Sequence, residues 1–427
     1  MSDAPLSATR PLRVAQFVDN YGPGTNGLTV AVQQLEGNLL DAGHEVIVVA
    51  PAAKGANPHA GRPGRTELRL PSVRVPRMPT RVASGRKFED TLDELERLRP
   101  DVLHVHGFGP VGALGVWAAL RTKIPMLLTW HTDFDAYADH YASVLPLLSG
   151  VVHAFAAYSH GEFVDRGELR AAEIEYEERG RSTATMLGIC AKMLRTADLV
   201  TTPSPKTATR CLRLAPDARI RVVPNGVDPL PPGTIEGLRS GDERLVLYAG
   251  RIAPEKGILL LAEAFELVAQ RRPGTKLVVV GNYRAYPKIR RALEKLAAQG
   301  SAILAGEKKR EELGAWYGSA DLFCFPSQTD TQALVLHEAA LAGLPIVLVD
   351  HELQLVLRPG VNGDIARPTA ASLAAGIMRV LDKLDDPEWA ATAAETSREL
   401  ASQWTIQSQA DEMLRLYQEL AQGRYSG

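Results

Sequence analysis

Short apolar, β-branched runs alternate along the chain with segments whose apolar residues recur at helical spacing. In the first half the apolar runs occupy residues 13–18, 45–50, 101–106, 126–131, 199–203 and 220–226. In the second half they occupy residues 244–250, 276–281, 302–306, 321–327 and 345–350. Strands that alternate with helices are typical of a parallel sheet covered on both faces. The pattern therefore predicts an α/β protein with two doubly wound, Rossmann-like domains.

A segment rich in Pro and Gly separates the two halves and is typical of a hinge. We expect an N-terminal α/β domain over residues 1–225, a linker over 226–240 and a second domain over 241–403. Residues 404–427 are expected to form a helix that packs back towards the N-terminal domain. Ligands of such sheets bind outside the carboxyl ends of the strands. Two facing domains would therefore form a deep cleft between them.

Composition narrows the class of protein without naming a function. The chain has 427 residues, a formal net charge of −2 and 45% hydrophobic residues, which is typical of a globular protein of two or three domains. It lacks the basic excess of nucleic-acid-binding proteins, so no nucleic-acid partner is expected. The three cysteines have no paired spacing, and no secretion signal or stretch of ~20 apolar residues is found. These features predict a cytoplasmic protein.

Two loops are candidates for binding an anion, although common nucleotide motifs are missing. There is no G-x-G-x-x-G between the first strand and helix, and no P-loop motif, which argues against a dinucleotide oxidoreductase or a P-loop NTPase. In the first loop, Gly27 would let backbone N–H groups approach an anion, but it is equally a turn residue. In YAGRIAPEKG, Arg251 and Lys256 follow a strand and suit a diphosphate. An exposed basic loop is the alternative there.

The stretch FPSQTDTQALVLHEA contains two acidic residues eight positions apart, Asp330 and Glu338. A helix is expected to begin near Thr331, so its first N–H groups would form a second phosphate cradle. Carboxylates only accept hydrogen bonds, which makes sugar and ribose hydroxyls their natural partners. The residues also allow a structural interpretation, in which Ser327 and Asp330 form a capping box and Glu338 pairs with a neighbouring cation.

Taken together, these residues resemble the retaining GT-B-fold glycosyltransferases of family 4. The resemblance spans roughly residues 12–370 and rests on six motifs in the family's order. The motifs are GPGTNG, WHTD, ADLVTTPS, VVPNGVD, GRIAPEKG and FPSQTDTQALVLHEA. The first acid of the family's paired-acid motif is Asp here, as in a branch that is enriched in lipid glucosyl- and mannosyltransferases. The resemblance implies a GT-B fold with a nucleotide-sugar donor site in the second domain.

The resemblance also implies roles for individual residues. Arg251 and Lys256 would hold the donor diphosphate, Asp330 the sugar hydroxyls and Glu338 the ribose. His131 would lie beside the transferred sugar, and Gly27 would approach the phosphates. Backbone N–H groups that meet the diphosphate or sugar would come from Thr331, Gln332, Ala333 and Leu334. Gln332 and Ala333 replace the commoner Phe-Gly, so the sugar is left open.

The implied reaction transfers a hexosyl group from a UDP- or GDP-hexose to a hydroxyl of a lipid or glycolipid, with an α-glycosidic bond formed. No metal and no cofactor are expected, because two cationic side chains take the place of Mg²⁺ and no Asp-x-Asp pair is present. One alternative is the same transfer onto a soluble natural product or a sugar phosphate. Another is a non-catalytic sugar-nucleotide sensor, although such a protein need not keep His131.

Residues 61–87 hold seven Arg and one Lys against one acidic residue, Glu67. In the family this part of the chain borders the acceptor site. A basic, Pro-rich loop region with scattered apolar residues is expected to rest on an anionic membrane, which would make the protein peripheral at the inner membrane face. A phosphorylated soluble acceptor, or no ligand at all, would explain the same composition.

Overall fold

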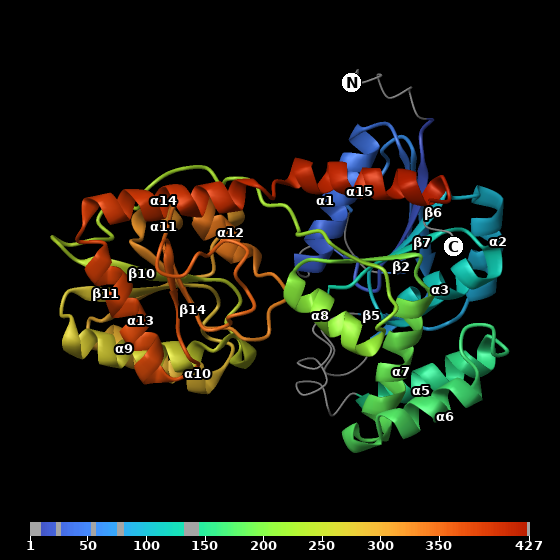
Figure 1. The fold of residues 1–427 in the computed structure, drawn as a ribbon, viewed down its shortest axis with the longest axis horizontal. Helices are drawn as coiled ribbons and strands as arrows, with labels where there is room; N and C mark the ends of the chain where they lie inside the picture. The colour runs from blue at the N-terminus through green and yellow to red at the C-terminus, as the bar shows by residue number, and fades with distance from the viewer. Residues whose placement is uncertain (1–9, 23–26, 53–56, 75–80, 132–144, 425–427) are drawn as a thin grey trace. The chain divides into compact units, whose positions relative to one another are not determined.

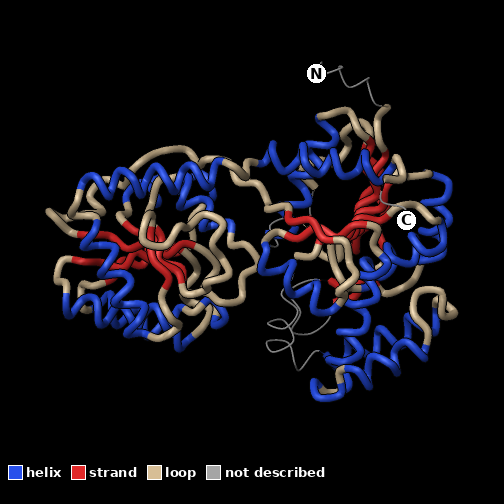
Figure 2. Tube along the Cα trace, in the orientation of Figure 1, coloured by secondary structure: helices blue, strands red, loops and turns tan. Residues whose placement is uncertain are grey.

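The computed structural model describes residues 10–22, 27–52, 57–74, 81–131 and 145–424, and the chain divides into two compact units (Figure 1). Unit 1 consists of Met1–Pro224 and Gln409–Gly427, and unit 2 of Asn225–Ser408. Each unit contains a sheet of parallel strands with helices on both of its faces (Figure 2). The predicted fold class, with two doubly wound domains, is therefore confirmed.

Unit 1 is built on a seven-stranded sheet with the order β3-β2-β1-β6-β7-β8-β9. Its strands are β1 (Arg13–Phe17), β2 (Glu45–Pro51), β3 (Arg65–Leu70), β6 (Val102–Val105), β7 (Met126–Thr129), β8 (Leu199–Thr202) and β9 (Ile220–Val222), with β4 (Ser72–Arg74) and β5 (Arg81–Ala83) as a separate antiparallel pair. Its helices are α1 (Gly27–Asp41), α2 (Phe88–Leu98), α3 (Pro110–Thr122), α5 (Leu145–Tyr158), α6 (Arg166–Glu175), α7 (Arg181–Thr196), α8 (Pro205–Leu214) and α15 (Ile406–Ala421), with the short η1 (Glu177–Arg179).

Side chains of the unit 1 strands alternate between the two faces, as the period of a strand requires. Val14 and Val46 pack in one cluster with Leu35 of α1 and Leu416 of α15. The neighbouring positions belong to a second cluster, which contains Ala15, Phe17 and Ile47 together with Trp117 of α3 and residues of α2 and α7. Because both faces are buried, the strands are continuous apolar runs, which is the pattern seen in the sequence.

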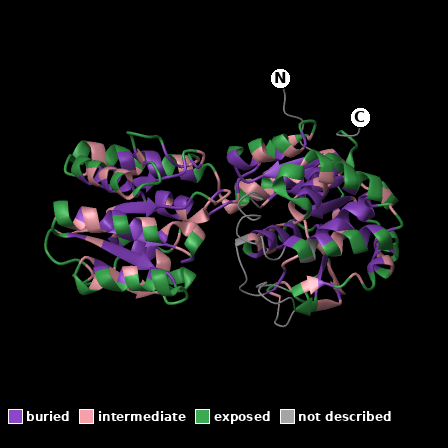
Figure 3. Ribbon diagram, turned by 90° about the horizontal axis from the view of Figure 1, so that it is seen from below, coloured by how far each residue is buried: buried purple, intermediate pink, exposed green. Residues whose placement is uncertain are grey.

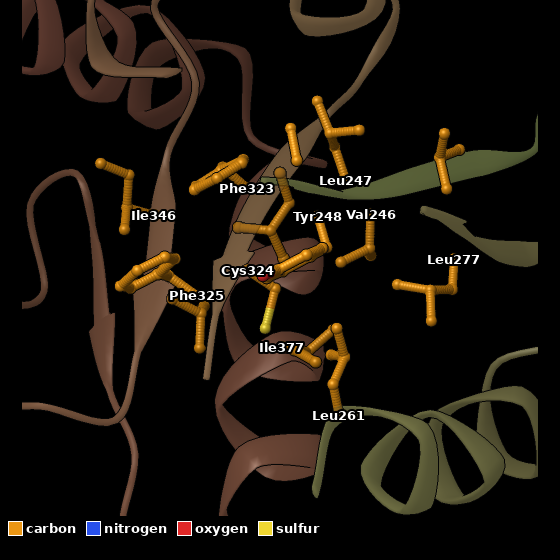
Figure 4. Close-up of a cluster of buried hydrophobic side chains, with 14 of the residues drawn as sticks. Val246, Leu247, Tyr248, Leu261, Leu277, Phe323, Cys324, Phe325, Ile346 and Ile377 are labelled. Carbon is orange, nitrogen blue, oxygen red and sulfur yellow. The ribbon is translucent and has the colours of Figure 1, made fainter. Parts of the chain in front are cut away.

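Unit 2 has a six-stranded sheet with the order β12-β11-β10-β13-β14-β15. Its strands are β10 (Arg244–Ala249), β11 (Thr275–Val280), β12 (Ala302–Gly306), β13 (Leu322–Phe325), β14 (Ile346–Leu348) and β15 (Gly363–Ile365). Its helices are η2 (Pro254–Lys256), α9 (Ile258–Arg271), α10 (Pro287–Ala298), α11 (Arg310–Ser319), α12 (Leu334–Leu341), α13 (Ala370–Lys383) and α14 (Pro387–Ser402). Figure 4 shows part of its core, where Leu261 of α9 and Ile377 of α13 lie close to Cys324 of β13.

Residues 226–240, which were expected to form a linker, pack against unit 2. Leu230, Ile235 and Leu238 contact its hydrophobic core, and the Ile235 N–H donates to Ser319 Oγ at 2.7 Å. Throughout the described residues, burial is concentrated in the strands and in the inner sides of the helices (Figure 3). The chain therefore gains its stability from two separate cores.

The C-terminal helix α15 is joined to the sheet of unit 1 by a buried hydrogen bond. Tyr417 is fully buried, and its hydroxyl lies 2.6 Å from Nδ1 of His104 on β6. On the other side of the same ring, His104 Nε2 lies 2.6 Å from Thr129 Oγ1. Both ring nitrogens of His104 are therefore satisfied inside the core, as buried polar atoms require.

We predict that Tyr417→Phe lowers the free energy of unfolding of unit 1 by about 1–3 kcal/mol, because it leaves His104 Nδ1 buried without its partner. Denaturant unfolding of the full-length protein measures this loss. The matched control is Tyr286→Phe, which removes the hydroxyl of an exposed tyrosine. It should change the midpoint of denaturant unfolding very little. Equal midpoints for Tyr417→Phe and the parent would show that the hydrogen bond contributes nothing.

Candidate functional site

The order of the strands in unit 2 reverses between β10 and β13. β10 pairs with β11 on one side and with β13 on the other, both in parallel register. The chain that follows β10 forms α9, and the chain that follows β13 forms α12, and these helices lie on opposite sides of the sheet in Figure 1. A reversal of this kind opens a crevice at the carboxyl ends of the strands, where ligands of open α/β sheets bind.

The predicted residues Lys256 and Asp330 meet at this edge of the sheet. Lys256 ends the short helix η2 after β10, and Asp330 lies in the loop after β13. Lys256 Nζ lies 2.6 Å from Asp330 Oδ1, and each side chain is only 16% exposed. The pair therefore joins the two loops that flank the crevice, while part of both charged groups stays accessible.

Gly257 allows these loops to approach each other. It has a φ of 69°, and a Cβ at this position would lie 2.3 Å from the carbonyl oxygen of Pro326 in the loop after β13. Only glycine has both the conformation and the small size that this approach requires. The sequence APEKG thus places the ammonium group of Lys256 next to Asp330.

The predicted residue Arg251 lies at the same edge, directly after β10. Its backbone carbonyl accepts a hydrogen bond of 2.8 Å from the buried Tyr248 hydroxyl, which fixes the start of the loop. Its guanidinium group forms an ion pair with Glu255, and the side chain is 63% exposed. Glu255, in contrast, is only 16% exposed, so the guanidinium is the accessible half of this pair.

The helix that carries Glu338 begins later than predicted. α12 starts at Leu334, and Ala333 adopts a left-handed conformation with φ of 62°. The prediction that the helix begins near Thr331, with four successive N–H groups at its N-terminus, was therefore wrong. The capping box proposed for Ser327 and Asp330 is also absent, since the helix has no side-chain cap.

The cause of this late start is a set of hydrogen bonds made by Gln332. Its Oε1 accepts hydrogen bonds of 2.8 Å from both the N–H and the Nδ2 of Asn225, and its Nε2 donates to the Asn225 carbonyl at 2.9 Å. Gln332 is 3% exposed, so these bonds hold the backbone of the loop against the PNG segment. Tertiary contacts thus override the local tendency of the sequence to begin a helix.

Glu338 pairs with a cation, as the structural interpretation of the sequence allowed, and it has a second partner that no sequence motif indicated. Its carboxylate is 3% exposed and lies 2.7 Å from Arg310 Nη1, and it accepts a hydrogen bond of 2.9 Å from the Tyr317 hydroxyl. Both partners belong to α11, more than twenty residues before Glu338, and no local motif links them to it. A carboxylate can accept about four hydrogen bonds, so each oxygen keeps capacity for a further donor.

His131 follows β7 in unit 1 and belongs to a cluster of three histidines at the carboxyl edge of that sheet. His106 Nδ1 lies 3.4 Å from His131 Nε2, and the rings of His104 and His106 are tilted by 43° with centroids 3.7 Å apart. Burial lowers the pKa of His131 to about 4, and burial together with the neighbouring imidazoles lowers the pKa of His104 and His106 well below 6.5. All three side chains are therefore neutral at pH 7.

Unit 1 also has a reversal of strand order, between β1 and β6, and a buried carboxylate occupies it. Asp19 follows β1 and accepts hydrogen bonds of 2.9, 2.8 and 3.2 Å from the N–H groups of Gly109, Val111 and Gly112 at the start of α3. The sequence analysis missed this residue. The sequence signal that could have indicated this site is the G-x-G-x-x-G spacing from Gly107 to Gly112. This motif leads into α3, and the N-terminus of α3 binds the Asp19 side chain.

The remaining predicted residues are placed as follows. Gly27 is the first residue of α1, after the loop that follows β1. In the part of the chain that the structure describes, no group of three or more His, Cys, Asp or Glu side chains is arranged to hold a metal ion. Likewise, the described helices include none whose length and apolar character would let it cross a membrane.

Comparisons with known proteins agree with this architecture. The profile of Glycosyltransferase Family 4 matches residues 25–229, and the profile of Glycosyl transferases group 1 matches residues 243–383. Together they cover the whole sheet of unit 2 and the sheet of unit 1 apart from β1. The protein is therefore a glycosyltransferase of the GT-B fold. More specifically, it belongs to the family 4 glycosyltransferases, with a family 4 domain followed by a group 1 domain.

The chain is similar to several curated glycosyltransferases. It is 25% identical to the alpha-monoglucosyldiacylglycerol synthase of Acholeplasma laidlawii, over 82% of this chain and 84% of the relative. It is 26% identical to the GDP-mannose-dependent alpha-mannosyltransferase of Corynebacterium glutamicum, over 80% of this chain and 73% of the relative. Among solved structures, sucrose-phosphate synthase of Thermosynechococcus elongatus has a TM-score of 0.67 at 21% identity, with 96% of this chain and 99% of that chain covered. This last likeness shows the fold.

The histidine cluster predicts how the stability of unit 1 depends on pH. Because the folded-state pKa values lie below those of the unfolded chain, stability is fully present above about pH 6.5 and falls as pH decreases towards 4. His106→Asn removes one of these groups. The loss of stability between pH 6.5 and 5 should then become smaller by up to about 1.4 kcal/mol per pH unit.

Denaturant unfolding at several pH values measures this slope in the parent and in the variant. The matched control is the exposed His351→Asn. A parental slope that is unchanged by His106→Asn, or a protein that becomes more stable as pH falls from 6.5 to 5, would contradict the assignment of neutral, buried imidazoles.

Proposed function

We propose that this protein is a retaining, metal-independent hexosyltransferase that moves a hexosyl group from a UDP- or GDP-hexose to a hydroxyl of a lipid or glycolipid. The observation that carries the proposal is the meeting of Lys256 and Asp330, with Arg251 beside them, where the strand order of unit 2 reverses. This edge combines two cations for a diphosphate with a carboxylate for sugar hydroxyls, which are the two parts of a nucleotide-sugar donor.

In this proposal each charged group has one role toward the donor. Lys256 and the exposed Arg251 bind the diphosphate, and a phosphate oxygen takes the place of Asp330 as a partner of Lys256. Asp330 then accepts hydrogen bonds from the sugar, while Glu338, held by Tyr317, accepts them from the ribose. The N–H groups of Thr331, Gln332, Ala333 and Leu334 complete the donor site, although their segment is a loop and the first turn of α12.

The proposed chemistry proceeds on one face of the sugar. The bond between the anomeric carbon and the donor phosphate oxygen breaks, and a bond to the acceptor oxygen forms on the same face. The acceptor proton passes to the departing phosphate oxygen. The positive charges of Lys256 and Arg251 stabilise the diphosphate as it leaves, in place of a divalent metal ion. His131 lies beside the sugar as a neutral hydrogen-bonding group, and Gly27 leaves room for the phosphates at the start of α1.

The proposal of a lipid acceptor rests on the relatives and on the basic segment 61–87. By its name, the relative from Acholeplasma laidlawii synthesises a glucosyl diacylglycerol. The relative from Corynebacterium glutamicum is named a mannosyltransferase that depends on GDP-mannose. In the structure, part of the segment is the strand β3, where Arg65 is 4% exposed and forms ion pairs with Glu36 and Glu67. Arg65 is therefore structural, and the interpretation of the whole segment as a loop was wrong.

The exposed part of this segment is smaller than its composition suggests. Arg74, Arg86 and Lys87 are exposed, and Val73 is 51% exposed beside them on β4. We propose that these residues, rather than the whole segment 61–87, contact an anionic membrane surface. Lys and Arg near such a surface each contribute about 1 kcal/mol of attraction.

We predict that Arg251→Ala and Lys256→Ala each lower the transfer rate about a hundredfold, because each removes a charge that stabilises the leaving diphosphate. The measurement is glucosyl or mannosyl transfer from UDP-glucose and GDP-mannose to diacylglycerol in mixed micelles. Lys295→Ala, on the exposed face of α10, is the matched control and should keep the parental rate.

Lys256→Ala could unfold the protein, because Asp330 loses its partner. Arg251→Ala changes a largely exposed side chain and therefore still tests whether the diphosphate binds at this edge. Rates within threefold of the parent for Arg251→Ala would contradict a diphosphate at this edge. The same assay in excess EDTA tests metal independence, since a rate abolished by EDTA and restored by Mg²⁺ would overturn that part of the proposal.

We predict that variants of Asp330 and Glu338 differ in their affinity for nucleoside diphosphates. Calorimetry with UDP and GDP should show that Asp330→Asn leaves affinity for the bare nucleoside diphosphate within about threefold, because this residue is assigned to the sugar. Glu338→Gln should weaken it about tenfold, which is the scale of one hydrogen bond to a charged group. Equal affinity and equal transfer rates in both variants and the parent would show that the carboxylates are structural.

A further inference from the structure

Residues of α5, α6 and α7, helices of unit 1 that lie together in Figure 1, line a pocket of about 600 Å³. Its charged lining consists of Arg166, Arg170 and Glu173 of α6 and Arg181 of α7, with His153 of α5 beside them. Leu169 and Ala156 also line the pocket, but they are only 2% and 5% exposed. The volume falls within the range of roughly 300–1,000 Å³ that is usual for small-molecule sites.

The single carboxylate of the pocket is already engaged. Glu173 Oε1 lies 2.9 Å from Arg181 Nε and 3.7 Å from His153 Nε2, and it accepts a hydrogen bond of 3.4 Å from the Thr185 hydroxyl. Arg166 and Arg170, in contrast, form no ion pair with any of the residues that the structure describes. The three guanidinium groups and one carboxylate leave two positive charges in the pocket.

The placement of these arginines is unfavourable for the helices that carry them. Arg166 and Arg170 are four residues apart on one face of α6, where like charges repel each other. Arg166 is also the first residue of α6 and Arg181 the first residue of α7, where the helix dipole disfavours cations. A bound anion would offset all three effects at once.

We propose that this pocket binds a phosphate monoester through Arg166 and Arg170. A phosphate monoester carries close to two negative charges at neutral pH, which matches the two positive charges of the pocket. Arg166 and Arg170 each present a planar fork of donors to the phosphate oxygens, a geometry that suits bidentate binding. The pocket is larger than a bare phosphate ion requires, so the ligand is an ester.

None of the residues that line this pocket is assigned to the proposed donor site. The phosphate monoester could be a soluble metabolite or the head group of a lipid. The experiment therefore uses two probes, namely glycerol 3-phosphate in solution and phosphatidylcholine vesicles that contain phosphatidic acid.

The test compares the full-length parent with the double variant Arg166→Ala/Arg170→Ala. Both arginines are exposed, so their replacement should not disturb the fold. Arg291→Ala/Lys295→Ala is the matched control, since it removes two cations four residues apart on the exposed face of α10. Calorimetry measures binding of glycerol 3-phosphate, and sedimentation measures binding to the vesicles, both at constant ionic strength.

We expect the double variant to bind at least one probe ten or more times more weakly than the parent, while the control binds as the parent does. Weakening with glycerol 3-phosphate indicates a soluble ester, and weakening with the vesicles alone indicates a lipid head group. Equal binding of both probes by parent and double variant overturns the proposal. Binding that is lost in Lys256→Ala but kept in the double variant also overturns it, because the phosphate would then occupy the donor site.

Discussion

The ion pair between Lys256 and Asp330 is the contact on which the geometry of the candidate site depends. It joins the loops after β10 and β13, two neighbouring strands whose following helices leave on opposite sides of the sheet. A crevice at such a point would lack a fixed shape if each loop moved independently. The 2.6 Å contact, together with the close approach at Gly257, sets the separation of one cation and one carboxylate before any donor arrives. In the proposed function a donor phosphate replaces Asp330 as the partner of Lys256, so donor binding exchanges one ion pair for another.

The two units share a sheet topology but use their reversal points differently. In unit 1 the N-terminus of α3 is occupied by the carboxylate of Asp19, so the place where an open sheet commonly binds phosphate is already satisfied. In unit 2 the corresponding edge carries Lys256 and the largely exposed Arg251, whose charges are only partly neutralised by Asp330 and Glu255. This difference in charge supports the proposed assignment of the diphosphate to unit 2.

Local patterns in the sequence predicted every strand of the two sheets except β3 and β15, because strands buried on both faces must be apolar throughout. They also indicated Arg251, Lys256 and Asp330, since these residues lie in loops directly after predicted strands. The partners of Glu338 could not be predicted, because Arg310 and Tyr317 come from α11 and meet it only through the tertiary fold. Asp19 escaped notice for the same reason, as its three donors lie about ninety residues away in the chain.

The start of α12 shows most clearly how a long-range contact can decide a local structure. Ala333 has a φ of 62°, a conformation that costs an alanine roughly 1–2 kcal/mol and that glycine adopts freely. The bonds between Gln332 and Asn225 more than offset this cost, because they satisfy a buried amide that would otherwise lack partners. Gln332 and Ala333 therefore act together, since the strain at Ala333 is maintained by the hydrogen bonds of its neighbour. Because α12 begins only at Leu334, Asp330 lies in a loop and Glu338 in the helix, and the two carboxylates belong to separately supported segments.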